Sequence, residues 1–372
     1  MKASLLDERF MRIALREAAK GAGHTSPNPA VGAVIVKDGR VLSKGWHQAA
    51  GCPHAEIEAL ASLKSSVSAK GATIYVTLEP CCTHGRTSAC TDALIKAGIK
   101  RVVFGTTDPN PAHAGRAIPI LKKAGLQVTT GVLGDECAAL NPGFNHWITT
   151  GLPLVIAKAG LSLDGRLTRP RGESQWLTSK ASRADAMHLR TQVDAILIGA
   201  GTLRADNPKL TIRAVPGFEK KQPWRVVVSR KGLLPKSSHL FTDKHRTRTL
   251  SYRGKTLRSI LADLGKRGCT SVMIEGGGSL LGSAFDAGLV DKIQFYIAPL
   301  LCGGTEVIGG KGASSLLESV QLTNVSYLQL GDDIRITADV MSPFSKKLLK
   351  YSATHFAGVK SYSFEAKLID VS

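Results

Sequence analysis

Apolar and polar positions along residues 1–150 predict helices and strands in alternation. Residues 7–20 carry apolar side chains on a 3.6-residue period, which predicts a helix that ends at Gly21. Residues 31–42 predict a hairpin around an Asp38-Gly39 turn. Further helices are expected at 55–63, 91–97, 115–124 and 135–146, and further strands at 72–78, 101–105 and 127–131. This alternation predicts a three-layer α/β domain over residues 1–150.

The second half repeats the alternation without repeating the sequence. Strands are expected at 154–157, 195–199, 225–229, 271–275, 292–298 and 334–341, and helices at 180–191, 256–267 and 279–287. Gly151-Leu152-Pro153 marks a boundary, so a second α/β domain is expected over residues 151–341. Residues 342–372 have no partner in this pattern, and we expect a C-terminal extension of unknown role.

Composition narrows the class of protein. With 43% hydrophobic residues, each domain can bury a core, which excludes a disordered chain. No apolar run approaches the ~20 residues that cross a bilayer, and Asp7 and Glu8 interrupt any signal-peptide core, so we expect a cytoplasmic protein without membrane contact. The net charge is +20, but only 5% of residues are aromatic. We therefore expect the charge to serve anionic small ligands and not nucleic acid.

One cluster of residues has the spacing of a metal site. His54-Ala55-Glu56 is followed by Glu79-Pro80-Cys81 and then by Cys90. Zinc nucleobase deaminases carry H-x-E followed by P-C-x-x-C, but here His84 stands three residues after Cys81. Three ligand sets therefore compete: His54/Cys81/Cys90, His54/Cys81/His84 and His54/Cys82/Cys90. Adjacent cysteines rarely bind one tetrahedral metal together, so Cys82 is expected to be a bystander.

The residue types in this cluster suit hydrolytic deamination. One imidazole and two thiolates leave a fourth zinc position open for water, whose pKa the metal lowers. A carboxylate beside the metal must then carry protons to the departing ammonia. Glu56 lies two residues from His54 near a helix start, which predicts that role for it.

A triple glycine in the second half predicts an anion site. Gly276 to Gly278 follow an expected strand and precede an expected helix, where free backbone N–H groups favour anions. The run misses the G-x-G-x-x-G fingerprint because Leu281 stands where the third glycine belongs. A Rossmann fold is therefore not expected.

Taken together, these motifs resemble the bifunctional riboflavin-biosynthesis deaminase/reductase family. The resemblance covers residues 5 to about 340 and rests on 27–35, 54–90, 108–111, 158–166, 172–178, 188–190, 194–202, 206–213 and 274–280. It implies an N-terminal cytidine-deaminase-like three-layer domain and a C-terminal dihydrofolate-reductase-like α/β domain. In this family a longer loop separates the two thiolates, so the resemblance implies His54, Cys81 and Cys90 as zinc ligands and Glu56 as proton shuttle.

The resemblance also implies contacts to substrate and cofactor. The deaminase pocket would be lined by Asn28, His47, His84, Arg86, Asp108 and Asn110. The reductase substrate would contact Ser174, Arg190, Leu210, Arg213 and Glu275. The nicotinamide cofactor would contact Gly160, Trp176, Thr202, Asp206, Ser229, Gly276, Gly277 and Gly278.

The function implied is two consecutive steps on one phosphorylated pyrimidine. A deaminase with one Zn²⁺ per chain releases ammonia, and an NADPH-dependent reductase then opens the ribose to a ribityl chain. We also expect a homo-oligomer. The alternatives are a tRNA or free-nucleobase deaminase with an appended domain, and a nucleic-acid-binding protein with an inactive deaminase fold.

One departure from the family is expected: residues 241–255 are basic and weakly patterned, so part of the wall beside the cofactor would be missing or rebuilt.

Overall fold

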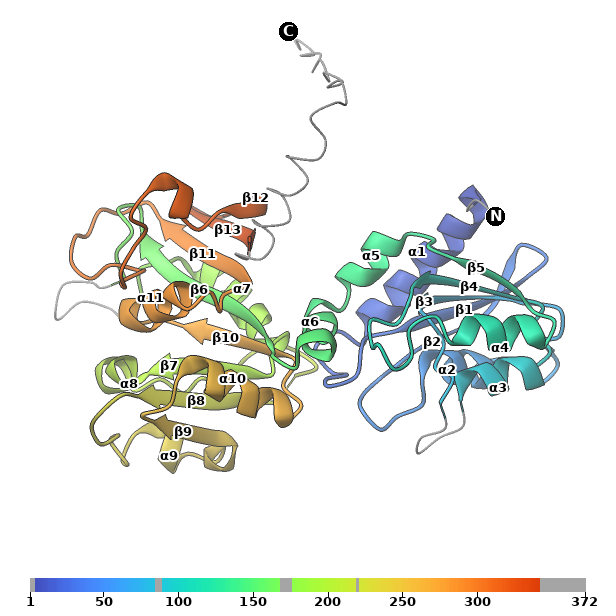
Figure 1. Cartoon of the computed structure of the whole chain (residues 1–372), viewed down its shortest axis with the longest axis horizontal. Coiled ribbons are helices and arrows are strands. Elements are labelled where there is room, and N and C mark those ends of the chain that lie inside the picture. The colour runs from blue at the N-terminus through green and yellow to red at the C-terminus, as the bar shows by residue number, and fades with distance from the viewer. Residues whose placement is uncertain (1–3, 84–88, 168–175, 219–220, 342–372) are drawn as a thin grey trace, which may run out of the picture.

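The computed structural model of the chain describes residues 4–83, 89–167, 176–218 and 221–341. Two separate β-sheets organise these residues, one of five strands and one of eight, and helices cover both (Figure 1). The expected α/β alternation is confirmed in both halves. No helix in the described ranges is long and apolar enough to span a membrane.

The five-stranded sheet has the order β2-β1-β3-β4-β5. A hairpin of antiparallel β1 and β2 turns at Asp38 and Gly39, which both have positive φ, and β3, β4 and β5 run parallel to one another. Its strands are β1 (Gly32–Lys37), β2 (Arg40–Trp46), β3 (Thr73–Leu78), β4 (Arg101–Thr106) and β5 (Gln127–Thr130).

Helices lie on both faces of this sheet, as a three-layer domain requires. They are α1 (Leu5–Ala19), α2 (Ala55–Ala61), α3 (Cys90–Lys96), α4 (Ala117–Lys123) and α5 (Gly134–Ala139). Because strand side chains alternate, Ile74 packs with α2, α3 and α4 on one face, whereas Tyr75 packs with α1 and α5 on the other. Because β3 and β4 are parallel neighbours, their carboxyl ends lie side by side at one edge of the sheet.

The eight-stranded sheet has the order β12-β13-β11-β6-β10-β7-β8-β9. From β11 to β9 neighbouring strands are parallel, whereas β13 is antiparallel to both β11 and β12. Its strands are β6 (Leu154–Ser162), β7 (Ala195–Gly199), β8 (Trp224–Ser229), β9 (Thr249–Arg253), β10 (Ser271–Glu275), β11 (Lys292–Ala298), β12 (Leu322–Leu330) and β13 (Asp333–Val340).

Two groups of helices cover the faces of the larger sheet. One face packs against α10 (Leu257–Lys266) and α11 (Gly278–Asp286). The other packs against α7 (Lys180–Thr191), α8 (Ala200–Asp206) and the short α9 (His239–Thr242). Two 3-10 turns, η1 (Arg246–Arg248) and η2 (Leu316–Glu318), complete the described elements.

Three expectations about the elements are wrong. The helix expected at 135–146 is two helices, α5 and α6 (Pro142–Thr150), because Pro142 cannot continue α5 and starts α6 instead. Strand β12 and helix α8 were not expected. The segment 241–255 does contain regular structure, since β9 extends the sheet beyond β8 and α9 precedes it. The passage that was expected to be missing or rebuilt therefore contains a helix and a strand.

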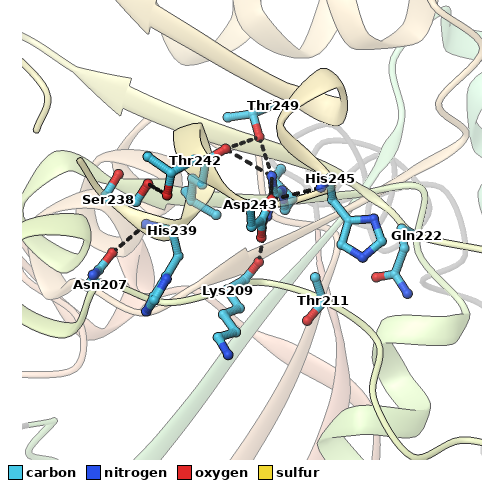
Figure 2. A network of polar contacts seen from close by, with 12 residues as sticks. Asn207, Lys209, Thr211, Gln222, Ser238, His239, Thr242, Asp243, His245 and Thr249 are labelled. Atoms are coloured by element: carbon cyan, nitrogen blue, oxygen red, sulfur yellow. Dashed lines mark hydrogen bonds and ion pairs between the residues drawn. The ribbon is translucent and has the colours of Figure 1, made fainter. Parts of the chain in front are cut away.

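A buried arginine explains how this basic segment is held. Arg225 of β8 is fully buried and makes two bonds to Asp243, from Nη1 to Oδ2 at 2.6 Å and from Nη2 to Oδ1 at 2.9 Å. It also donates to the carbonyls of Lys209 and Leu240 and to Thr249 Oγ1. Figure 2 shows Lys209, Asp243 and Thr249 converging on this network. The order of the segment thus comes from polar contacts that a hydrophobic pattern does not show.

The helix α6 lies between the two sheets (Figure 1). Trp147 Nε1 donates to the carbonyl of Gly265 on α10 at 3.0 Å. Just before α6, the Asn141 side chain bonds both the N–H and the carbonyl of Ala30, at 2.7 and 2.8 Å. A second contact between the halves is the stack of His24 on Phe218, with ring centroids 4.1 Å apart.

Candidate active sites

Three side chains from three elements form a cluster that could hold a metal ion. His54 caps the N-terminus of α2, Cys81 follows β3, and Cys90 begins α3. The Nδ1 atom of His54 lies 3.3 Å from Cys90 Sγ and 3.5 Å from Cys81 Sγ. A nitrogen and a sulfur on one tetrahedral zinc, at about 2.05 and 2.3 Å from it, are about 3.5 Å apart. The donor set and its spacing therefore fit zinc.

The cluster bears on the three competing ligand sets. Within the described residues, the group with metal-ligand spacing contains Cys81 and Cys90 and not Cys82. Hydrogen bonds from the Cys90 thiol and from His54 lower the pKa of Cys81 to about 4, which favours its thiolate form. Burial, with the charges of Glu79 and Cys81, raises the pKa of Cys82. His84 lies outside the described residues, as does Arg86.

Glu56 lies in the first turn of α2, beside this cluster. It is 3% exposed. Burial, followed by the negative charge of Cys81, raises the pKa of Glu56 to about 7, although His54 opposes the shift. A carboxyl group with that pKa can both accept and release a proton near neutral pH.

Asn28 and His47 adjoin His54. Asn28 Nδ2 lies 3.1 Å from His47 Nε2, and His47 Nδ1 lies 2.9 Å from the carbonyl of Pro53. The rings of His47 and His54 meet edge to face at 5.5 Å. Burial lowers the pKa of His47, which favours its neutral form. The structure thus places Asn28 and His47 beside His54 of the candidate metal site.

Asp108 and Asn110 follow β4, at the same edge of the sheet as Cys81. The Asn110 N–H donates to Asp108 Oδ1 at 2.8 Å. Both side chains are half-buried. Burial raises the pKa of Asp108, and the negative charge of Cys81 raises it further. The two groups therefore interact electrostatically.

A second constellation, in the larger sheet, is built around Glu275 at the end of β10. Its carboxylate accepts from Lys158 Nζ at 3.0 Å and from Arg190 Nη2 at 2.8 Å. Burial alone would raise the pKa of Glu275, but these two cations lower it to about 2. Lys158 comes from β6 and Arg190 from α7, so three elements meet here.

The neighbouring loop contributes Leu210 and Arg213. Arg190 Nη1 donates to the carbonyl of Thr211 at 2.9 Å, and Leu210 is buried with a positive φ. Burial and the charge of Arg190 lower the pKa of Arg213, whereas Glu275 opposes this effect. The structure therefore brings Arg190, Leu210, Arg213 and Glu275 together. Ser174 lies outside the described residues.

The residues expected at the cofactor lie along the carboxyl ends of parallel strands. Gly276 and Gly277 follow β10 with positive φ, and a Cβ on Gly277 would lie 3.1 Å from Thr202 Oγ1. A Cβ on Gly278 would lie 2.2 Å from the carbonyl of Glu306, so only glycine fits there. Ser229 ends β8, opposite Arg253 at the end of β9.

The other expected cofactor residues are more dispersed. Gly160 lies within β6, where a Cβ would meet Thr178 at 3.2 Å. Asp206 ends α8 and is exposed, and Trp176 is 49% exposed with the Arg183 guanidinium 5.2 Å from its ring. Trp176 is therefore no core residue. These three residues come from separate parts of the domain: a strand, a helix end and the stretch before α7.

Sequence reasoning did not assign two residues that the geometry makes prominent. Lys158 donates to the carboxylate of Glu275, which lies 117 positions further along the chain. No local motif signals that pairing. Glu79 belongs to the Glu79-Pro80-Cys81 motif, but its contacts reach Ala117, 38 positions away. Only the residue type, an acid directly after a buried strand, could have signalled it.

Family models match both halves of the chain. Residues 5–106 match the cytidine and deoxycytidylate deaminase zinc-binding region, and residues 153–336 match the RibD C-terminal domain. Riboflavin biosynthesis protein RibD of Bacillus amyloliquefaciens is 40% identical over 360 residues, covering 90% of this chain and 96% of that protein. The Escherichia coli protein of the same name is 41% identical over 327 residues, covering 80% and 89%.

Solved structures agree with the sequence relatives. Acinetobacter baumannii RibD aligns with a TM-score of 0.82 at 35% identity and covers 91% of this chain and 99% of its own. A Thermotoga maritima diaminohydroxyphosphoribosylaminopyrimidine deaminase/5-amino-6-(5-phosphoribosylamino)uracil reductase gives 0.82 at 34%, covering 90% and 99%. These matches confirm the expected fold class, and they favour the two-step enzyme over both alternatives. The chain belongs to the RibD family, the zinc- and NADPH-dependent bifunctional deaminases and reductases of riboflavin biosynthesis.

Proposed function

We propose that the smaller sheet carries the deaminase step, with His54, Cys81 and Cys90 holding one zinc ion and Glu56 moving protons. The substrate class is a small phosphorylated pyrimidine, and we infer that it is 2,5-diamino-6-(5-phosphoribosylamino)pyrimidin-4-one. The observation that carries the proposal is the buried Glu56 carboxyl beside three side chains with zinc-ligand spacing. When bound, zinc acts as a Lewis acid that makes water nucleophilic at neutral pH.

The chain's own residues supply the rest of the deamination. The Glu56 carboxylate accepts a proton from the attacking water and passes it to the amino group, which leaves as ammonia. His47, neutral and fixed by the Pro53 carbonyl, holds Asn28 beside His54. We infer that Asn28, His47, Asp108 and Asn110 bind the pyrimidine and ribose phosphate. His84 and Arg86, expected at the same pocket, belong to the proposal on sequence alone.

We further propose that the larger sheet carries the reductase step. When bound, NADPH would supply the hydride that, together with one proton, reduces the ribosyl group of the deaminated pyrimidine to ribityl. Glu275 stays ionised between Lys158 and Arg190, so it can accept a hydrogen bond from a hydroxyl group of the sugar while it fixes both cations. We infer that Arg190 and Arg213 pair with the phosphate. The substrate set includes Leu210 and, on sequence alone, Ser174.

The cofactor is assigned to the carboxyl ends of the parallel strands. We infer that the Gly276–Gly278 turn at the start of α11 receives its pyrophosphate, since free backbone N–H groups at a helix N-terminus favour an anion. Thr202 and Ser229 lie at the neighbouring strand ends. Gly160, Trp176 and Asp206 complete the proposed contacts.

We place the domain limits so that each domain carries one of the two activities. Residues 1–150 form the deaminase domain, 151–341 the reductase domain, and 342–372 an extension. We also propose that the enzyme works in the cytoplasm, because ligand thiols stay reduced there.

We propose a homo-oligomer formed through β12. This strand lies at one edge of the larger sheet. Tyr327 on it is 70% exposed, and Leu316 and Leu317 of η2 are 89% and 90% exposed. Exposed apolar patches at a sheet edge mark interfaces. Light scattering should give an oligomer for the parent and a monomer for Tyr327→Lys. Leu233→Lys, at an isolated leucine that is 85% exposed, is the matched control and should stay oligomeric.

One experiment tests the separation of the two steps. Glu56→Gln should release no ammonia from the diaminopyrimidine, yet retain one zinc per chain by elemental analysis. The same variant should oxidise NADPH normally when it is given the deaminated pyrimidine. Loss of zinc from a folded Glu56→Gln protein would mean that Glu56 is a ligand and not a proton carrier.

A further inference from the structure

Glu79 holds a loop of the deaminase domain through three backbone hydrogen bonds. It lies directly after β3 and is 5% exposed. Its Oε2 atom accepts from the N–H of Asp108 at 3.2 Å and of Gly115 at 2.8 Å. Its Oε1 atom accepts from the N–H of Ala117, the first residue of α4, at 2.9 Å. One carboxylate thus ties together both ends of the segment between β4 and α4.

The segment held in this way carries two of the proposed substrate contacts. Asp108 accepts from the N–H of Asn110 at 2.8 Å, and Asn110 Oδ1 accepts from the N–H of Ala112 at 3.0 Å. These bonds shape the loop internally but do not attach it to the metal cluster. Glu79 supplies that attachment, because it lies two residues before Cys81 on the same short stretch of chain.

The chemistry of Glu79 suits this task better than any neutral residue would. An ionised carboxylate is an acceptor only and offers two oxygens, which match three converging N–H donors. An amide in its place offers one oxygen, and its NH₂ group would face donors. Replacing the acid by glutamine therefore breaks at least one of the three bonds while keeping the size of the side chain.

We propose that Glu79 is a positioning residue, which fixes the 107–117 loop relative to Cys81 so that Asp108 and Asn110 meet the pyrimidine. This inference rests on the proposed roles of Asp108 and Asn110. It assigns Glu79 no contact with substrate or metal. Its loss should therefore act on substrate binding and leave zinc in place.

The test compares three variants of the full-length zinc enzyme in steady-state ammonia release and in NADPH oxidation. Glu79→Gln should raise the deaminase KM by about 10–100-fold, because losing one charge-assisted hydrogen bond to the substrate weakens binding by about that much. Its kcat should change only a few-fold, with one zinc per chain and unchanged NADPH oxidation on the deaminated pyrimidine. Asn110→Ala should raise the same KM.

Asp7→Asn is the matched control. Asp7 is another buried carboxylate of this domain, but it bonds Arg101 and Tyr75 on the α1 face of the sheet. The substitution should lower Tm and leave the deaminase KM unchanged. A KM increase in Asp7→Asn as large as in Glu79→Gln would reduce the role of Glu79 to general stability and overturn the inference.

The remaining outcomes separate this inference from the proposed site. A normal KM in Glu79→Gln together with a raised KM in Asn110→Ala would overturn the role of Glu79 alone. Normal KM values in both variants would remove the loop from the substrate site, and the inference with it. Zinc loss in Glu79→Gln would also overturn it. If Glu79→Gln does not fold, Glu79→Asp takes its place, since it keeps the charge but is one methylene shorter and should give a smaller increase in KM.

Discussion

The two sites each contain a glutamate with little exposure to solvent, yet the environments move the two pKa values in opposite directions. Burial and the thiolate of Cys81 raise the pKa of Glu56 to about 7. Glu275 is 18% exposed, and burial would raise its pKa too, but Arg190 and Lys158 lower the pKa to about 2. Burial alone therefore does not decide the protonation state: it sets the direction of the shift at Glu56, whereas two nearby cations outweigh it at Glu275. The deaminase gains a carboxyl group that exchanges protons at neutral pH, whereas the reductase gains a permanent anion that orients two cations.

The largest effect should come from removing a metal ligand. Cys90→Ser should lose zinc and reduce ammonia release by at least about 10³-fold, because the attacking water is no longer activated. Cys82→Ser, one residue from Cys81, is the control and should keep both. Elemental analysis with ammonia assays checks this. Zinc retained in Cys90→Ser but lost in Cys82→Ser would reverse the ligand assignment.

On the reductase side, Glu275→Gln should leave two cations without their shared anion. Breaking a buried ion pair costs about 3–5 kcal/mol of folding stability. The rate of NADPH oxidation should fall as well. Because the folded pKa of Glu275 is below its ordinary value of 4.5, its stabilisation is present above pH 4.5 and is lost toward about 2. The stability difference from the parent should shrink over that window in urea unfolding.

The control for this prediction is Glu306→Gln. Glu306 is exposed and pairs with Arg166 at 3.4 Å, so its loss should have almost no effect on stability. Equal destabilisation by both substitutions would show that the charges around Glu275 are screened by solvent. The contrast between the two sites would then disappear.

A smaller effect is expected at the edge of the reductase constellation. Arg213→Ala should weaken use of the phosphorylated pyrimidine by about 10–150-fold, the range for one charge-assisted contact, and change NADPH affinity little. Arg267→Ala, at a surface arginine that follows α10 and pairs with Asp263, should change neither. Separate KM values for the two ligands measure the effect. Equal weakening of both ligands would assign Arg213 to the cofactor side.

The smallest effect should appear in the zinc-free protein. Because the folded pKa of Glu56 is above its ordinary value of 4.5, stability falls as pH rises from about 4.5 to about 7. Glu56→Gln removes that penalty, so it should be more stable than the parent by about 1–3 kcal/mol at pH 8 and equal below pH ~4.5. Chemical unfolding at the two pH values checks the sign. A destabilised variant at pH 8 would contradict the raised pKa.

How far sequence reasoning reached depended on how local each signal was. His54, Glu56 and Cys81 stand at the spacings of a known signature, so the pattern alone predicted a zinc site, whereas Cys90 was chosen as the third ligand through the family resemblance. Lys158, Arg190 and Glu275 meet only because β6 and β10 pair in parallel and α7 lies across them. The periodicity of apolar residues along the sequence does not predict that these three side chains come together. Local spacing predicts chemistry held by one loop and two helix starts, but not chemistry assembled by a sheet.

Two strands escaped prediction for different physical reasons. Strand β9 has only five residues in a basic stretch, and contacts from the buried Arg225 near its start help to hold it in place. Strand β12 is long, but most of its side chains are exposed, so it lacks the clean alternation that burial on one face imposes. Helix α6 was merged with α5 because apolar periodicity continues across Asn141 and Pro142.

The position of α6 has a consequence for dividing this enzyme into separately produced halves. A cut after Thr150 leaves Trp147 on the first fragment and its hydrogen-bond partner, Gly265, on the second. A cut before Pro142 keeps that contact within the second fragment and leaves Asn141 with Ala30 in the first. The earlier cut preserves both of these sets of bonds but separates Asn145 Nδ2 from the carbonyl of Ala138, so co-expressed fragments divided there should keep the Trp147 and Asn141 contacts.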